Sequence, residues 1–187
     1  FVVSAPAGAG KNTLVDLLKA EFSAVEETVS CTTRAKRPLE QEGVEYFFLS
    51  KEAFQKKVEE GAFLEYNEVL GEFYGTLKTE VFSRLRLGRH VVAVIDVKGA
   101  LQIKKQMEAA MIFIRPPSVE ELKKRLEKRN TEKPEEIVGR LKLAEAELKL
   151  AEAYDYFILN DNIQEAYQVL KAIFIAEEHR NRRTKLI

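Results

Sequence analysis

A glycine-rich run that ends in lysine is the part of the sequence whose residue types point most directly to chemistry. It follows an apolar segment typical of a buried strand, precedes apolar residues at helical spacing, and consists of Ala5-Pro6-Ala7-Gly8-Ala9-Gly10-Lys11-Asn12-Thr13. Small residues let backbone N–H groups turn toward an anion, and the start of a helix adds a favourable dipole. Lys11 can then reach the β- and γ-phosphates of a nucleotide, so the run predicts a phosphate-binding loop. The alternative is an ordinary strand-to-helix turn.

Two positions of this loop depart from the usual pattern G-x-x-x-x-G-K-[ST]. Ala5 stands at the first glycine, which costs little if its backbone keeps a negative φ. Asn12 replaces the hydroxyl that normally helps to hold Mg²⁺. An amide oxygen also ligates a hard cation, directly or through a water, so Asn12 is the candidate metal contact. Thr13 supplies a hydroxyl one residue later, but a helix turns it about 100° away.

A second candidate anion site contains two arginines, Arg34 and Arg37, after a hydroxyl-rich run. Guanidinium groups suit phosphate oxygens because they donate in a bidentate fork. Surface arginines are common, so this signal is weak by itself. Tyr46 and Tyr74 add hydroxyl groups from the same aromatic-rich segment, and Gly75 lets a backbone approach a ligand closely. Alternatively, both tyrosines are core residues with a wetted hydroxyl.

Hydrophobic patterning predicts the elements that position these groups. The 187 residues are 45% hydrophobic and 32% charged, which is typical of one globular domain with an appended subdomain. Apolar strands at 1–4, 91–95, 111–114 and 156–159 alternate with helical segments and favour a parallel sheet covered on both faces. Residues 28–77 hold short aromatic strands punctuated by glycines and predict a small, mostly antiparallel insertion. The polar residues 128–136 between two amphipathic helices are either a mobile lid or a solvated loop.

Several function classes find little support in the composition. The net charge is zero, so no overall field attracts nucleic acid or a membrane surface. Cys31 is the single cysteine, which excludes an internal disulfide and fits a reducing cytoplasm. His90 and His179 lack metal-site spacing. No segment approaches the roughly 20 apolar residues of a membrane span, and no signal peptide is visible. The chain begins inside a strand without methionine, so we expect N-terminal residues to be missing.

The chain resembles the guanylate kinase family nearly from end to end. The segments that carry the resemblance are short, but their order and spacing are specific: Gly8-Ala9-Gly10-Lys11, Ser30-Cys31-Thr32-Thr33-Arg34-Ala35-Lys36-Arg37, Gly43-Val44-Glu45-Tyr46-Phe47-Phe48, Phe63-Leu64-Glu65, Phe73-Tyr74-Gly75-Thr76, Ile95-Asp96-Val97-Lys98-Gly99, Ile114-Arg115-Pro116-Pro117-Ser118, Lys124-Arg125-Leu126-Glu127-Lys128-Arg129, Arg140-Leu141 and Asn160-Asp161. The resemblance implies a three-layer α/β P-loop fold. Its nucleotide-binding core would comprise 1–30 and 77–187, its mixed α+β GMP-binding subdomain 31–76, and its helical lid about 126–140.

The resemblance also implies Mg²⁺-dependent transfer of a phosphoryl group from ATP to GMP, and it assigns roles to residues. The GMP phosphate would be held by Arg34, Arg37, Tyr46 and Tyr74, and the guanine and its approach by Ser30, Glu65, Thr76 and Asp96. ATP would be bound by Ala7, Gly8, Ala9, Gly10, Lys11, Asn12, Thr13 and Arg125, with Asn160 near the adenine. The catalytic set would be Lys11, Arg34, Arg125, Arg129 and Arg140. Val94 stands where many relatives carry a second carboxylate near the metal, so Mg²⁺ is expected to be held largely by phosphates and water.

These residue types suit that reaction. A carboxylate at Glu65 accepts from guanine N1–H and N2–H₂, whereas adenine presents an unprotonated N1. The GMP phosphate is already ionised, so no general base is required. One alternative is a catalytically silent relative that binds phosphopeptides; Lys11 and the lid arginines argue against it, and ATP binding would decide. Another is a kinase of the same fold for a different phosphorylated small molecule, such as a ribose bisphosphate. ATP and GMP are the expected partners, and no nucleic acid, membrane or protein partner is implied.

Overall fold

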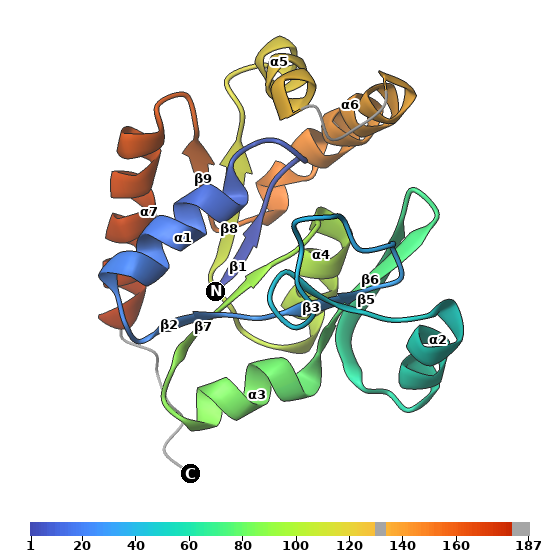
Figure 1. Ribbon diagram of the computed structural model, residues 1–187. Helices are drawn as coiled ribbons and strands as arrows, with labels where there is room; N and C mark the ends of the chain where they lie inside the picture. Colours follow the sequence, from blue (N-terminus) through green and yellow to red (C-terminus); the bar gives the residue numbers. More distant parts are fainter. Residues whose placement is uncertain (130–133, 181–187) are drawn as a thin grey trace.

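A parallel β-sheet forms the centre of the molecule in the computed structural model (Figure 1). The structure describes residues 1–129 and 134–180, and within them this sheet has five strands. Each strand is parallel to its neighbours, in the order β2 (Val25–Glu27), β7 (His90–Val94), β1 (Val2–Ser4), β8 (Met111–Arg115) and β9 (Tyr156–Leu159). The predicted α/β class with a parallel sheet is therefore confirmed.

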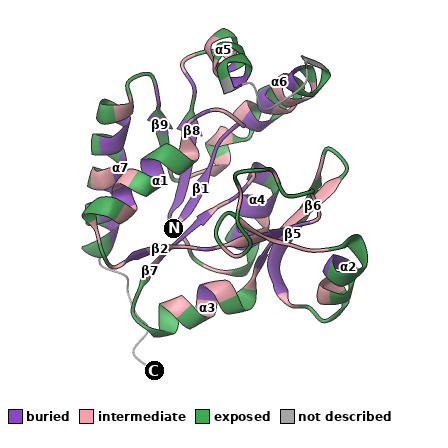
Figure 2. Cartoon of the chain, viewed as in Figure 1, coloured by how far each residue is buried: buried purple, intermediate pink, exposed green. Residues whose placement is uncertain are grey.

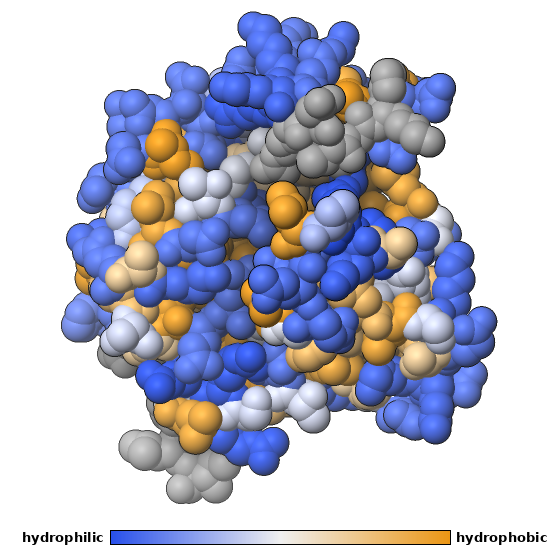
Figure 3. Space-filling model, viewed as in Figure 1, coloured by the Kyte–Doolittle hydropathy of each residue, from blue (hydrophilic) through white to orange (hydrophobic). Residues whose placement is uncertain are grey.

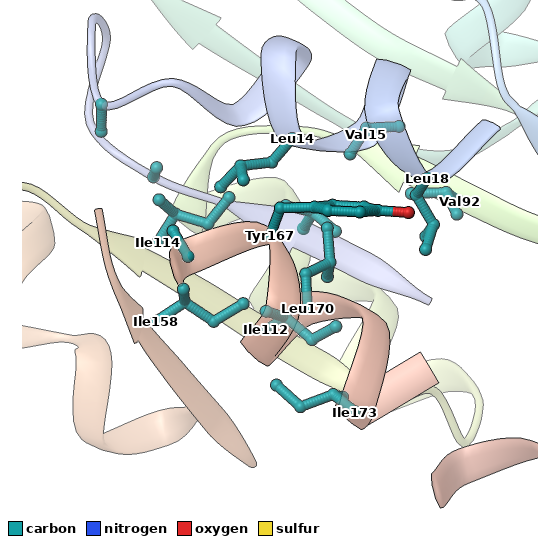
Figure 4. Close-up of a cluster of buried hydrophobic side chains, with 14 of the residues drawn as sticks. Leu14, Val15, Leu18, Val92, Ile112, Ile114, Ile158, Tyr167, Leu170 and Ile173 are labelled. Atoms are coloured by element: carbon teal, nitrogen blue, oxygen red, sulfur yellow. The ribbon is translucent and has the colours of Figure 1, made fainter. Parts of the chain in front are cut away.

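Helices cover both faces of this sheet, as the near-continuous apolar strands require. On one face lie α1 (Lys11–Glu21) and α7 (Ile163–Glu178), and on the other α3 (Lys78–Arg86) and α4 (Val97–Gln106). Neighbouring strand residues alternate between the two cores, because successive side chains of a strand point to opposite faces. The larger core joins α1, α7 and the sheet through Leu14, Val15, Leu18, Val92, Ile112, Ile114, Ile158, Tyr167, Leu170 and Ile173 (Figure 4).

A second, smaller sheet is built from the chain between Ser30 and Leu77. Its order is β4 (Tyr46–Phe48), β3 (Ser30–Thr32), β6 (Glu72–Leu77) and β5 (Phe63–Val69). The β3–β6 and β5–β6 pairings are antiparallel, and the β3–β4 pairing is parallel. Helix α2 (Lys51–Glu59) closes its small core by stacking Phe54 on Phe63, with ring centroids 4.4 Å apart. This unit lies beside the parallel sheet, beyond α4 (Figure 1).

Two further helices lie over the carboxyl end of the parallel sheet (Figure 1). These are α5 (Val119–Arg129) and α6 (Pro134–Lys149), and the short 3₁₀ helix η1 (Ala151–Ala153) leads from α6 to β9. The predicted lid covers the end of α5 and the start of α6, but residues 130–133 within it lie outside the described chain. The division into a core, a GMP-binding subdomain and a lid therefore remains a prediction.

Burial follows this layered arrangement. Buried residues concentrate on the strands and on the helix sides that face them, whereas the outer sides of the helices are exposed (Figure 2). Hydrophilic side chains cover most of the face shown in Figure 3, with apolar side chains between them. Among the described residues, every helix is too short or too polar to cross a bilayer.

Candidate active site

The glycine-rich run forms the turn between β1 and α1, at the centre of the parallel sheet. Gly8 and Gly10 have φ of 89° and 93°, values that favour glycine over residues with a side chain. Within the described part of the chain, no side chain caps α1, so the N–H groups of its first turn stay available for an anion. Ala5 does not have a positive φ, so alanine fits there without strain. Lys11 curls back over the loop, and its Nζ donates to the Ala5 carbonyl at 2.6 Å.

Asn160 fixes this loop from below. It follows β9, is 4% exposed, and its Nδ2 donates to the Ala9 carbonyl at 2.8 Å. A Cβ on Gly10 would lie 2.3 Å from the same Nδ2, so the amide packs directly against the loop. The Asn160 carbonyl accepts from Arg125 Nη1 at 3.1 Å, which brings a predicted lid arginine next to the P-loop. A contact between Asn160 and adenine stays a prediction.

The candidate metal contact lies on the exposed side of the loop. Asn12 and Thr13 are both exposed in the first turn of α1. Among the described residues, no group of three or more His, Cys, Asp or Glu side chains is arranged to hold a metal ion. An exposed amide beside the P-loop lysine fits an ion that is carried mainly by phosphate oxygens and water.

Three of the predicted guanine residues meet on the face of the smaller sheet. Glu65 on β5 is 3% exposed, and its Oε1 accepts from Thr76 Oγ1 at 2.6 Å. Thr76 Oγ1 in turn lies 3.5 Å from Ser30 Oγ, on the next strand. Burial raises the pKa of the Glu65 carboxyl to about 7, the negative charge of Asp96 adds to the rise, and hydrogen bonds from Thr76 oppose it. The result is a buried acceptor whose hydroxyl partners hold it in one orientation.

Asp96 joins this group from the parallel sheet. It is the N-cap of α4, and its Oδ1 accepts from the Gly99 N–H at 2.9 Å. Asn67 of β5 donates through Nδ2 to both Asp96 oxygens, each at 3.3 Å. Sequence reasoning missed Asn67, because an asparagine next to a turn ordinarily indicates only the turn. The contact ties the smaller sheet to the carboxyl end of β7.

The predicted phosphate site is built around an arginine that already holds a carboxylate. Arg34 Nη2 donates to Glu40 Oε1 at 2.7 Å, and the Arg37 N–H donates to Glu40 Oε2 at 2.9 Å. The Arg34 guanidinium lies 5.5 Å from the Tyr46 ring centre, and the Tyr46 and Tyr74 rings meet edge to face at 5.9 Å. The structure thus gathers all four predicted residues of this site.

Glu40 was not predicted from the sequence. Burial disfavours its charged form, yet hydrogen bonds from the Arg34 guanidinium and from the Arg37 backbone keep its pKa below the ordinary value. Glu40 is therefore a bound anion supplied by the chain itself. The spacing of Arg37 and Glu40 in a polar loop would be the signal for it, but many solvated loops show the same spacing.

A second unpredicted acid, Glu147, is buried where the charges of several predicted site residues act on it. It lies on α6 and is 8% exposed. Burial raises its pKa to about 7; Lys11 and Arg140 counteract this rise, and Asp96 adds to it. Glu147 also lines a cavity of about 200 Å³ between α6, the start of α4 and the end of β5. The charges of Lys11 and Arg140 thus both act on the Glu147 carboxyl. Arg129 is the last residue of α5, and its side chain lies outside the described part of the chain.

The candidate site has two halves, which suit two different anions. Backbone N–H groups with Lys11 form one half, and Arg34 with its tyrosines forms the other. The buried Glu65 carboxylate and its hydroxyl partners lie in the second half. Such an arrangement suits transfer of a phosphoryl group between two phosphates, one of which belongs to a purine recognised at its donor edge.

Comparisons with known proteins agree with this geometry. A profile of the guanylate kinase family matches residues 1–177. The chain is 52% identical to the guanylate kinase of Protochlamydia amoebophila over 180 residues, which covers 96% of this chain and 91% of that protein. It is 50% identical to the guanylate kinase of Chlamydia trachomatis over 181 residues, covering 96% and 88% respectively.

A solved structure gives the same result. The crystal structure of guanylate kinase from Anaplasma phagocytophilum superposes with a TM-score of 0.77 at 34% sequence identity, and the match covers 96% of this chain and 86% of that one. Agreement of the sequence profile, the relatives and the structure over nearly the whole chain confirms the family resemblance found in the sequence. The chain belongs to the guanylate kinase family, whose members are nucleoside monophosphate kinases.

Proposed function

We propose that this chain transfers the γ-phosphoryl group of ATP to GMP, giving ADP and GDP, at the site between the P-loop and the smaller sheet. The observation that carries the proposal is the buried Glu65 carboxylate, 3% exposed and held by the Thr76 hydroxyl at 2.6 Å. A buried acceptor of this kind discriminates steeply, because a base that cannot donate to it leaves it unpaired.

Guanine would be selected by its donor edge. Glu65 accepts from N1–H and N2–H₂, while Ser30, Thr76 and Asp96 border the base. Adenine carries no proton on N1, so it would present a lone pair to the carboxylate. Asn67 holds Asp96 in place through two hydrogen bonds, which supports a fixed rather than adaptable base site.

The GMP phosphate would bind where Glu40 now pairs with Arg34. The phosphate is the stronger ligand for this site because it carries more charge and can also accept from Arg37, Tyr46 and Tyr74. Binding then requires Arg34 to exchange one anion for another. The nucleophile is an ionised phosphate oxygen, so no side chain has to remove a proton.

The ATP phosphates would lie over Ala7, Gly8, Ala9 and Gly10, with Lys11 released from Ala5 to reach them. The positive charges of Arg125, Arg129 and Arg140 would converge on the transferred group from the lid side. A Mg²⁺ ion bound to the ATP phosphates would supply further charge neutralisation, with Asn12 near it directly or through a water. The chain's own residues align the two phosphates and exclude water, which is most of what this reaction needs.

Two further assignments go with this function. Asn160 lies beneath the P-loop and is placed next to the adenine. The cytoplasm is the proposed location, because Cys31 is the single cysteine of the sequence and allows no internal disulfide, which fits a reducing compartment. A silent phosphopeptide-binding module is less well supported, since Lys11 and a loop shaped by Gly8 and Gly10 at positive φ serve no purpose in it.

A coupled assay for ADP tests the proposal. GMP, dGMP, AMP, UMP and a ribose bisphosphate are offered as acceptors with MgATP, and ATP binding is measured separately by calorimetry. Rapid ADP formation with GMP, and at least a hundredfold lower kcat/KM with AMP, is the expected result. Failure to bind ATP would favour the silent module, and turnover of a sugar phosphate in place of GMP would favour a different kinase of this fold.

A further inference from the structure

Gly99 occupies a helix position that glycine would normally weaken. It is the third residue of α4, is buried, and does not have a positive φ, so its backbone would accept any L-residue. Glycine in a helix interior is less stable than alanine, because the unfolded chain loses more freedom. A glycine there needs another reason.

The reason is the carboxylate opposite. A Cβ added to Gly99 would lie 2.2 Å from Glu65 Oε2 and 2.9 Å from Glu65 Cδ. Only the bare Cα leaves room for the acid to stand against the first turn of α4. The other carboxylate oxygen is held by Thr76 at 2.6 Å, so the side chain is confined from two sides.

We propose that Gly99 is a positioning residue for guanine selection, which acts by letting Glu65 place both carboxylate oxygens against the base. The proposal rests on the proposed function, in which Glu65 reads the donor edge of guanine. The Gly99 backbone N–H also donates to Asp96. Gly99 therefore contacts both Glu65 and Asp96, the two acids of the proposed base site.

The close approach of Glu65 to Gly99 predicts that a substitution at Gly99 weakens guanine binding more than it destabilises the fold. The obstructing atoms are the far end of the Glu65 side chain, so a methyl group at Gly99 is accommodated when the carboxylate shifts and gives up its bond to Thr76. The fold tolerates that movement, but guanine loses at least one charge-assisted hydrogen bond. Loss of such a bond corresponds to roughly a tenfold to hundredfold weaker affinity.

Gly99→Ala is the direct test, measured as KM and kcat for GMP and for ATP together with the melting temperature. We expect the KM for GMP to rise about tenfold to a hundredfold and the KM for ATP to stay within about twofold. The melting temperature should change little, because the gain in helix propensity offsets the lost bond to Thr76. Gly139→Ala is the matched stability control, because Gly139 also lies in a helix and its added Cβ meets Leu70 only at 3.7 Å. An unchanged KM for GMP in Gly99→Ala would overturn the proposal.

A double-variant cycle shows whether Gly99 acts through Glu65. If it does, Gly99→Ala with Glu65→Ala has a KM for GMP no higher than Glu65→Ala alone, since both the interaction and the obstruction are then gone. IMP, which lacks the exocyclic amine, should be less affected by Gly99→Ala than GMP. Additive effects on KM would overturn the proposal. If Glu65→Gln alone left GMP kinetics unchanged, the assignment of the base site would fail instead.

A third variant covers the outcome in which Gly99→Ala folds poorly. Glu65→Asp shortens the acid by one methylene and removes the obstruction, so Gly99→Ala with Glu65→Asp should regain the melting temperature of Glu65→Asp alone. A double variant as unstable as Gly99→Ala would show that the methyl group meets something other than Glu65, and would overturn the proposal.

Discussion

Replacing Glu65 with glutamine should make the nucleotide-free protein more stable at alkaline pH. Burial raises the pKa of Glu65 from 4.5 to about 7, with the charge of Asp96 adding to the rise and hydrogen bonds from Thr76 opposing it. One pKa unit corresponds to about 1.4 kcal/mol, so ionising this acid in the folded chain lowers the free energy of unfolding by up to about 3 kcal/mol. Glutamine carries no charge, and its carbonyl oxygen still accepts from Thr76.

The stability advantage of Glu65→Gln over the wild type should grow as pH rises. Well below the ordinary pKa, Glu65 is protonated in both the folded and unfolded chain, so ionisation contributes no difference between wild type and Glu65→Gln. As pH rises toward the folded pKa, the unfolded chain releases its proton first, and the wild type loses stability relative to the variant. Beyond the folded pKa the difference stays constant. Urea unfolding without nucleotide at about pH 5 and about pH 8 measures most of this range.

The control is Glu68→Gln, on the same strand at an exposed position, which should follow the wild type at both pH values. A stability difference between Glu65→Gln and wild type that is the same at both pH values would refute the reasoning, because it would come from packing and not from ionisation. Glu65→Gln should also raise the KM for GMP and leave the KM for ATP nearly unchanged, since an amide presents one donor where guanine needs two acceptors.

Three further substitutions test the separate halves of the site. Lys11→Met should abolish turnover and leave GMP binding nearly intact by calorimetry; equal loss of GMP binding in a folded variant would show that the two halves are not independent. Arg37→Ala should weaken GMP binding by about 1–3 kcal/mol through a lost charge-assisted bond. Guanosine, which lacks the phosphate, should bind the variant and the wild type equally well, and an equal loss of guanosine binding would show that Arg37 is structural. Asn12→Ser should shift the Mg²⁺ dependence of activity to lower concentration by roughly 1 kcal/mol, and an unchanged profile at limiting Mg²⁺ would remove this position from the metal's surroundings.

The central sheet could be predicted because its strands are short apolar runs between helices, and the structure confirms those runs as β1, β7, β8 and β9. Strand β2 was missed because Val25–Glu27 contains two glutamates and lies at the sheet edge, where one face stays partly exposed. The parallel β3–β4 pairing was missed for a different reason. The polar connection between these strands has no periodicity, so nothing in it sets the direction of return.

The site divides in a similar way. The P-loop is readable from local chemistry, because the glycines, the lysine and the flanking elements are contiguous. Glu65 gained its role only from the family resemblance, since a glutamate in a short strand is ordinarily exposed. The roles of Glu40 and Glu147 depend on burial in the tertiary structure, which cannot be predicted for a charged residue in a polar loop or helix from the sequence alone. Gly99 did carry a signal, as an isolated glycine in a helical pattern.

The pairing of Glu40 with Arg34 has a consequence for the crowded mixture of anions in a cell. An unpaired guanidinium would bind many phosphates and carboxylates of the cell non-specifically, and these anions would inhibit the protein. Here an intruder must first displace an internal partner held by two hydrogen bonds, at 2.7 and 2.9 Å. A free phosphate has only that exchange to draw on, whereas a nucleotide adds the binding of its base. If Arg34 holds the GMP phosphate as proposed, the Glu40 carboxylate would therefore favour a ligand that has both a phosphate and a base over a free anion.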